Sequence, residues 1–527
     1  MEEDQDYDSA RSDDGDERRR PGGVRSFPSR REIPGVDRIS DLSDSIIHHI
    51  LSFLPADDAV RTSVLSRRWI SLWTHAPKLT FKCDCYCSSS TLRRFFRFVD
   101  KTLFFYSSSK MEKFELDFGY IKAKDRACAK TTESRLESLI DKWLLLVTRR
   151  HVEELSLNFR KSVEIGNYGY RYLYPIPQFV FNSSSLTKLS TRDCYYAPER
   201  QVCWTSLRAL TIEQAGLSND MLLKILAGSP MLKYLKLHVC WVINSINISS
   251  SSVLEYLEVR DCWSITRIDA SSNSSLEKLV LKEMRNRMNK KENNVIEISC
   301  PNLKSVEISG CWFQRVCRLL DASSLIHACL TFQFDVEIFQ FDYVDISKEL
   351  LEKIKHVKKI TLGPYCVQVL SFLEFNGLLS PLSGSSCECL ILNANLNECY
   401  PFGLAHLLHC FATLQKLVID MTIISEDSPE DVFPENYLER VDRTFICLLE
   451  HLKTIEITSF RPYEHEPDAL GFVSFLLGNA RVLKEMVIHF GRKVSEFDIG
   501  ERAKLFDLTQ KLLSLPRCSP HAVVLID

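Results

Sequence analysis

Three alternating cysteines, Cys83, Cys85 and Cys87, are the first residues whose type and spacing suggest a chemical site. Thiolates are good zinc ligands, but a structural zinc site uses ligands two to four residues apart with a matching second pair. The sequence contains no Cys-x-x-Cys pair, and no histidine pair stands in the needed context. We therefore expect no zinc site at this cluster and no metal in the protein.

Histidines next to acidic or thiol side chains are the other candidates for acid–base or metal chemistry. The His48-His49 pair lies in an apolar helical segment, where neighbouring side chains point in different directions. His406 and His409 lie beside Cys410, which indicates a partly buried helix face rather than a metal site. The Glu-His-Glu run at residues 464–466 lies between two prolines, which favours a solvated loop.

Sequence motifs for nucleotide binding or hydrolysis are absent. Neither G-x-G-x-x-G nor G-x-x-x-x-G-K-[ST] occurs, so no glycine-rich loop is predicted to hold a phosphate. A G-x-S-x-G nucleophile turn is also missing. We therefore predict a protein without a cofactor and without catalytic residues.

Composition narrows the class of protein further. The chain has 527 residues, a formal net charge of −3 and 19 cysteines at irregular intervals. A charge near zero argues against a general nucleic-acid binder, and the odd, scattered cysteines favour reduced thiols over a secreted disulfide framework. The first ten residues lack an apolar signal segment, and no apolar run is long enough to cross a bilayer. We expect a protein of the nucleus, the cytoplasm or both, bound neither to membrane nor to nucleic acid.

The first 33 residues form a charged tail. Eight carboxylates lie among residues 1–16, and six arginines follow by residue 31. Such a segment cannot bury apolar surface, so residues 1–33 are predicted to be disordered. The arginines could form a nuclear-import signal, and a solvated tail is the alternative.

Residues 37–76 have the apolar spacing of three short helices. Asp41 or Ser43 is the expected N-cap of the first helix, which Pro55 stops, and Asp57 or Asp58 is expected to cap the second. Three helices in so few residues are too small to be stable alone, so this module should pack against a partner. The apolar residues of the first helix are Leu42, Ile46, Ile47, Ile50, Leu51 and Leu54, and those of the others are Val60, Val64, Leu65, Trp69, Leu72 and Trp73.

From about residue 110 onward the unit L-x-x-L-x-L recurs. Each unit predicts one short strand whose anchors enter a core shared with its neighbours, because no single repeat can bury its own apolar face. Between Leu186 and Leu325 the units start 21 to 27 residues apart, the spacing of leucine-rich repeats. The middle anchors include Leu155, Leu189, Leu210, Leu235, Leu257, Leu279, Val306, Ile360, Leu417, Ile455 and Met486, with degenerate units at Leu325 and Cys387 and a first one at Met111.

Residues 37–76 resemble an F-box, and the whole chain resembles the plant family that joins an F-box, leucine-rich repeats and a C-terminal FBD region. The most specific part of the F-box resemblance is the block Val64–Trp69 with Leu72-Trp73, because it combines a small residue, a basic pair and two tryptophans. Ser43 stands where the family usually has proline. The other matching segments are Asp37–Leu42, Ile46-Ile47 and Ile50–Pro55 in the F-box and Leu452–Ile457, Leu476–Ala480, Val482–Met486 and Arg517–Pro520 in the FBD region.

The resemblance implies a partner for the F-box: a Skp-type adaptor, and through it a cullin. The adaptor contacts it implies are Leu42, Ile46, Ile50, Leu54, Pro55, Val64 and Leu65; for each of them, packing inside the module is the alternative. Trp69 and Trp73 are expected mainly in the module's own core.

The predicted fold is α/β: a three-helix F-box followed by a leucine-rich-repeat solenoid, a horseshoe with a parallel sheet on its concave side. The expected parts are the tail (1–33), the F-box (34–80), a linker or first repeat cap (81–110), the repeats (111–444) and an FBD region that continues the solenoid (445–527). The predicted function is a non-catalytic substrate receptor of an SCF-type ubiquitin ligase that captures an unknown target protein on its repeats.

Two alternatives remain open at this point. The first is a stand-alone repeat scaffold without ligase activity. The second is a repeat surface that holds a small molecule to recruit the target, which would need a cluster of basic side chains on the concave surface. The strands offer only Lys188, Arg208, Lys233 and Lys236 for such a cluster.

Overall fold

A computed structural model describes residue 39 and residues 41–83, 89–120, 126–161, 173–248, 253–273, 275–285, 295–312, 315–333, 348–375, 377, 385–393, 401–421, 445–460, 462–491 and 499–527. The chain divides into two compact units, Met1–Ile47 and His48–Asp527. The predicted disordered tail lies outside the described residues.

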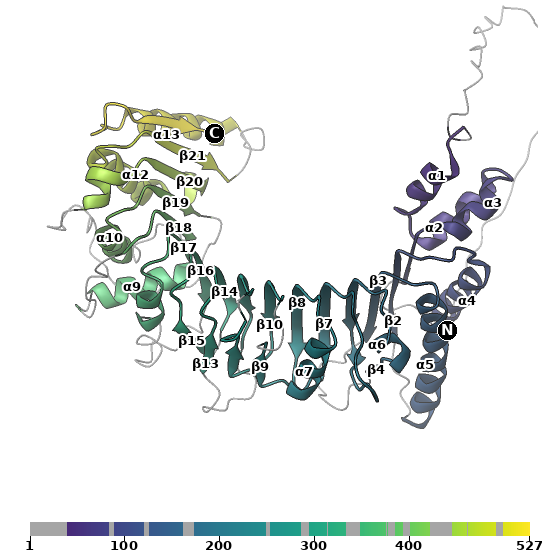
Figure 1. Ribbon diagram of the computed structural model, residues 1–527. Helices are drawn as coiled ribbons and strands as arrows, with labels where there is room; N and C mark the ends of the chain where they lie inside the picture. Colours follow the sequence, from purple (N-terminus) through teal and green to yellow (C-terminus); the bar gives the residue numbers. More distant parts are fainter. Residues whose placement is uncertain are drawn as a thin grey trace, which may run out of the picture. The chain divides into compact units, whose positions relative to one another are not determined.

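A 16-stranded parallel sheet dominates the second unit, and its strands lie side by side almost in sequence order (Figure 1). The strands are parallel because the connection after each strand brings the chain back to the same end of the sheet before the next strand begins. The strands are β1 (Lys78–Cys83), β2 (Lys113–Tyr120), β3 (Glu154–Lys161), β5 (Lys188–Arg192), β7 (Ala209–Ala215), β8 (Tyr234–Cys240), β10 (Tyr256–Arg260), β12 (Lys278–Lys282), β14 (Ser305–Cys311), β16 (His327–Gln333), β17 (Lys359–Leu362), β18 (Cys389–Asn393), β19 (Lys416–Asp420), β20 (Thr454–Phe460), β21 (Glu485–Phe490) and β22 (Val523–Ile526).

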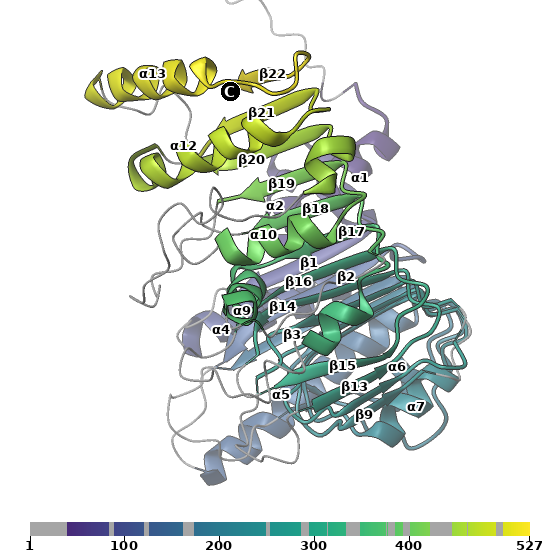
Figure 2. The same cartoon turned by 90° about the vertical axis from the view of Figure 1, so that its left-hand side faces the viewer.

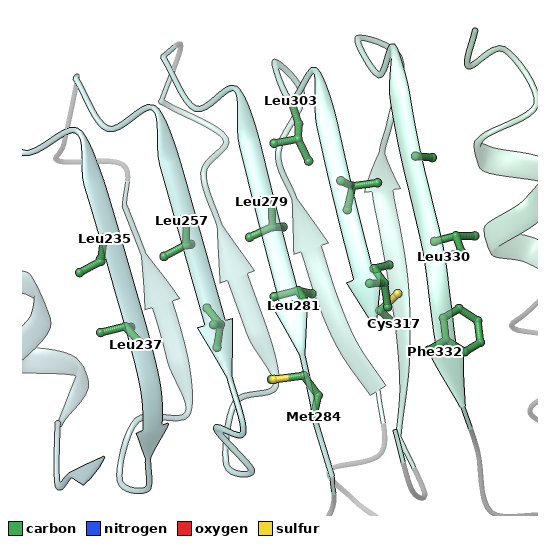
Figure 3. Packing of buried hydrophobic residues seen from close by; sticks show 14 of the residues in the cluster. Leu235, Leu237, Leu257, Leu279, Leu281, Met284, Leu303, Cys317, Leu330 and Phe332 are labelled. Carbon is green, nitrogen blue, oxygen red and sulfur yellow. The ribbon is translucent and has the colours of Figure 1, made fainter. Parts of the chain in front are cut away.

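The predicted anchors lie in register across this sheet. Leu235 of β8 pairs with Leu257 of β10, which pairs with Leu279 of β12, and all three side chains are fully buried. Figure 3 shows these leucines at one level on consecutive strands, with Leu237 and Leu281 at the next level. The register confirms the repeat assignment, including the degenerate units, because Ala328 and Leu390 occupy the same row.

A second layer packs against part of the anchor-bearing side of the large sheet, along the strands from β8 to β16. Four short parallel strands form a sheet of their own, and α7 packs beside its strand β9 (Figure 2). Sequence analysis did not identify these strands. They are β9 (Ser245–Asn247), β11 (Arg267–Asp269), β13 (Val295–Ser299) and β15 (Val316–Asp321), and a further pair is β4 (Tyr174–Pro175) with β6 (Cys194–Tyr195).

Helices lie in the F-box segment and in connections between strands. The F-box segment holds α1 (Asp44–Leu51), α2 (Ala56–Arg61), η1 (Thr62–Val64), α3 (Trp69–Leu72) and η2 (Trp73–His75). The repeats add α4 (Ser89–Phe105), α5 (Arg126–Thr148), α6 (Gln178–Phe181), α7 (Asn219–Ala227), α9 (Pro364–Phe375), α10 (Pro401–Cys410), η4 (Cys447–His451), α12 (Pro462–Asn479) and α13 (Ile499–Ser514).

The sheet begins earlier than the repeats were predicted to begin. β1 starts at Lys78 and pairs along its whole length with β2, so the sheet reaches the edge of the F-box. The region predicted as a linker or first repeat cap, 81–110, therefore contains the end of this strand and helix α4. At the other end, β20, β21 and β22 continue the sheet through the region predicted as FBD.

A left-handed residue follows the strand core in successive repeats. Each has φ between 50° and 58° and directly precedes a residue that enters the core. The turn lets the chain leave the sheet and cross to the second layer. These residues are Asp193, Gln214, Val239, Asp261 and Glu283, and Gly310 takes the equivalent place with φ 76°.

Candidate adaptor interface and target-binding face

Helix α1 begins where the sequence predicted. It starts at Asp44, so Ser43 stands at the N-cap position, and its carbonyl accepts hydrogen bonds from the backbone of Ile46 and Ile47. The Ser43 hydroxyl lies 2.9 Å from Oγ of Ser45. Serine can therefore take the place where the family usually has proline.

The cap predicted for the second helix is wrong. Pro55 occupies the N-cap position of α2, and its carbonyl accepts a hydrogen bond from the backbone of Ala59. Asp57 and Asp58 lie instead in the first turn, where carboxylates favour the positive end of the helix dipole. Both form ion pairs with Arg61, at 3.6 and 3.0 Å.

In the first unit, the described apolar side chains differ in exposure. Ile47 is fully buried, whereas Ile46 is 47% exposed and Leu42 is half-buried. Of the two residues predicted here as adaptor contacts, Ile46 is the more accessible.

In the second unit, the remaining predicted contacts are largely accessible to solvent. Val64 is 85% exposed, Ile50, Pro55 and Leu65 are also exposed, and Leu54 is half-buried. Soluble monomers rarely leave this much apolar surface in one short segment, so such a set marks an interaction surface. The assignment of these residues to an adaptor remains a prediction.

The structure adds two exposed apolar residues that sequence reasoning missed. Phe53 is 72% exposed, and Ile70 of α3 is also exposed. Helical spacing alone did not separate them from core residues. Trp69 and Trp73 are buried, which confirms their assignment to the core of the module.

The second candidate site is the side of the large sheet that does not carry the anchors, here called the open face. On β8 and β10 it holds Lys236 and Glu258, which form an ion pair at 3.0 Å. Tyr256 donates to Glu258 at 2.8 Å, and His238 lies 3.2 Å from it. Glu258 lies between the anchors Leu257 and Val259, yet its side chain is buried among these partners.

Electrostatics fix the charge state of this cluster. Burial raises the pKa of Glu258, but hydrogen bonds from Lys236 and Tyr256 more than offset it and hold the pKa below its usual value. A hydrogen bond from His238 lowers the pKa of Glu213 in the same way, because both stabilise the ionised carboxylate. The two carboxylates therefore remain ionised around His238.

Along the open face, the described charged residues largely neutralise each other in the first half of the sheet. Lys188 pairs with Glu154 at 2.6 Å, and Lys82 pairs with Glu115 at 3.0 Å. Lys233 and Lys236 are also paired with carboxylates. Three of the four basic residues considered for a small-molecule site are thus engaged in ion pairs, which argues against that site.

The other end of the open face is more apolar. One row across neighbouring strands is formed by Ile391, Val418, Glu456, Val487 and Leu525. Four of these five side chains are apolar, and each is at least partly exposed. A row of partly exposed apolar side chains is a candidate surface for docking another protein.

The cysteines are the remaining candidates that the sequence offered for a chemical site. Cys83 is buried, whereas Cys85 and Cys87 lie outside the described residues. Of the 15 cysteines with described side chains, most are buried. Among the residues described, no group of three His, Cys, Asp or Glu side chains is placed to hold a metal ion.

One local prediction needs correction. The Glu-His-Glu run at residues 464–466 lies in the first turns of α12 and not in a loop, because Pro462 stands at the first helical position, where proline is tolerated. On α10, His406 is buried and His409 is half-buried, which agrees with the partly buried helix face that the sequence indicated. In the described part of the chain, no helix has the length and apolar character needed to cross a membrane.

Comparison with known proteins identifies the class. An F-box domain profile matches residues 39–80, a profile described as "FBD-associated F-box protein At5g56370, LRR repeats" matches residues 140–333, and an FBD profile matches residues 445–488. The three matched regions coincide with the helical segment, the central repeats and the last part of the sheet. The chain is therefore an F-box protein with leucine-rich repeats and an FBD region.

Three relatives from Arabidopsis thaliana support the family. F-box/LRR-repeat protein 25 is 34% identical over 216 residues, which cover 41% of this chain and 72% of the relative. F-box/LRR-repeat protein At5g02910 is 28% identical over 86% of this chain and 89% of the relative, and F-box protein At5g03100 is 29% identical over 68% and 100%. The chain belongs to the plant F-box/LRR-repeat family.

Proposed function

We propose that this protein is the substrate-recognition subunit of an SCF-type cullin–RING ubiquitin ligase. Its F-box docks a Skp-type adaptor, which links it to a cullin, and its repeats capture a target protein. The ubiquitin-transfer chemistry resides in the other subunits, so this chain acts without catalytic residues of its own. The proposed location is the nucleus, the cytoplasm or both.

The exposed apolar side chains of the F-box carry this proposal. Val64, Leu65 and Phe53 expose surface that is covered only when a partner binds, at roughly 25 cal/mol per Å² of apolar area. Trp69 and Trp73 of the same segment are buried. A preformed apolar surface on a rigid support favours docking with little ordering cost.

The test is co-purification with the adaptor. Replacing Leu54 with Asp and Pro55 with Ala puts a charge into the proposed interface, and we expect adaptor binding to be lost while the sheet remains folded. Phe506→Asp is the matched control, because Phe506 is an exposed apolar residue of α13, outside the F-box. Unchanged co-purification of the double variant would contradict the proposed docking and favour the stand-alone scaffold.

The open face is the proposed target-binding surface. We expect Val487→Asp and Leu525→Asp to remove a target without affecting adaptor binding, because both residues lie in the apolar row. Affinity purification with the proteasome blocked, followed by mass spectrometry, identifies proteins that wild type captures and this variant does not. If wild type and the Val487→Asp, Leu525→Asp variant recover the same proteins, the target binds elsewhere.

A further inference from the structure

Helices α9 and α10 pack closely enough to bring functional groups from both into contact. The backbone N–H of Gly403 donates to Oγ of Ser371 at 2.8 Å. A Cβ at residue 403 would lie 2.6 Å from the carbonyl oxygen of Val367, so only glycine permits this approach. The side chains that follow on α10 are therefore held against α9.

A thiol, an imidazole and a carboxylate form a connected chain at this contact. Sγ of Cys410 lies 3.2 Å from Nε2 of His406, and Nδ1 of His406 lies 2.8 Å from Oε2 of Glu374. His406 and Glu374 are almost completely buried, with 3% and 7% of their side chains exposed. Cys410 keeps 8% exposure at the end of α10.

This order of groups activates a nucleophile. A carboxylate that accepts from one imidazole nitrogen orients the ring and makes the other nitrogen a stronger base toward the thiol. The thiolate is the reactive form of cysteine, and a neighbouring imidazolium stabilises it. The proposed function of the chain uses none of these three residues.

Cys447 provides a contrast in the same region. Its thiol donates to the backbone carbonyl of Leu408 at 3.1 Å and is fully buried. Burial raises the pKa of the Cys447 thiol to about 12. A buried thiol without an imidazole partner of this kind stays protonated and inert.

We infer that Cys410 is a modification site, a thiol activated by His406 and Glu374 that is oxidised by hydrogen peroxide. The Cys410 sulfur attacks one peroxide oxygen, an S–O bond forms and the O–O bond breaks. The proton held by His406 passes to the departing hydroxide, which leaves as water. The sulfur loses two electrons and becomes a sulfenic acid, and the peroxide gains them.

The first test uses the folded wild-type protein. Native protein is labelled with iodoacetamide, and the rate at each cysteine is read by mass spectrometry. We expect Cys410 to react at least about tenfold faster than Cys447, with a rate that reaches its plateau at lower pH than that of the exposed Cys518. A Cys410 as slow as Cys447 would overturn the inference.

The second test separates activation from simple exposure. His406→Gln and Glu374→Gln should each slow Cys410 labelling and lower the yield of sulfenic acid trapped after peroxide treatment. Ser371→Ala is the matched control, because it loosens the same helix contact without touching the thiol. Circular dichroism checks that each variant is folded. If Ser371→Ala slows labelling as much as His406→Gln, the imidazole does not activate Cys410.

Discussion

Replacing Leu257 with alanine tests the shared core of the repeats most sharply. Leu257 is fully buried in β10, between Leu235 of β8 and Leu279 of β12. The change removes three carbon groups at about 0.8 kcal/mol each in lost transfer free energy. The cavity adds to this, so we expect the free energy of unfolding to fall by about 2–5 kcal/mol.

The assay combines urea unfolding with hydrogen exchange. Because each repeat contacts mainly its neighbours, the loss of protection should be greatest in β8, β10 and β12 and small in the F-box. Lys236→Ala is the control, since its side chain is substantially exposed on the same part of the sheet. A Leu257→Ala protein as stable as wild type, or one that loses protection equally everywhere, would refute the nearest-neighbour core.

Three further predictions concern the same repeats. Glu258→Ala should cost more stability than Lys236→Ala, by about 1–3 kcal/mol, because it leaves the Tyr256 hydroxyl without its acceptor and removes one of the two carboxylates beside His238; equal urea midpoints would contradict the buried cluster. The lowered pKa of Glu213 and Glu258 contributes stability that is present above about pH 4.5 and is lost as pH falls through the folded pKa. The urea midpoint of a Glu213→Gln, Glu258→Gln variant should therefore fall less between about pH 6 and pH 3 than the urea midpoint of wild type. Val239→Gly should raise the free energy of unfolding by up to about 1 kcal/mol, because a β-branched residue at φ 53° is strained; a clear loss would show that its side-chain packing matters more.

The repeat register could be predicted because its signal is local. Anchors such as Leu235 and Leu237 identify a strand within a few residues, and the same pattern then recurs. Strand β1 was missed because Ala76 takes the first anchor place and the unit directly follows the F-box. The second sheet was missed because strands as short as Ser245–Asn247 leave no periodic pattern.

Burial that arises from neighbouring strands could not be predicted. Glu258 has a polar side chain at an outward position, and only pairing places Lys236 and His238 of β8 beside it. The Cys410–His406 contact follows from helical spacing, but Glu374 is 32 residues away on another helix. Exposure of Phe53 likewise depends on how the short helices pack, which apolar spacing does not specify.

Assembly with the adaptor and the cullin tests the central claim most directly. The chain, a Skp-type adaptor and the N-terminal domain of a cullin are mixed and separated by size-exclusion chromatography with mass measurement. We predict a single complex with one copy of each for wild type and for Phe506→Asp, and none for the variant with Leu54→Asp and Pro55→Ala. A wild-type chain that elutes apart from the adaptor–cullin pair would contradict the proposed role as a ligase subunit.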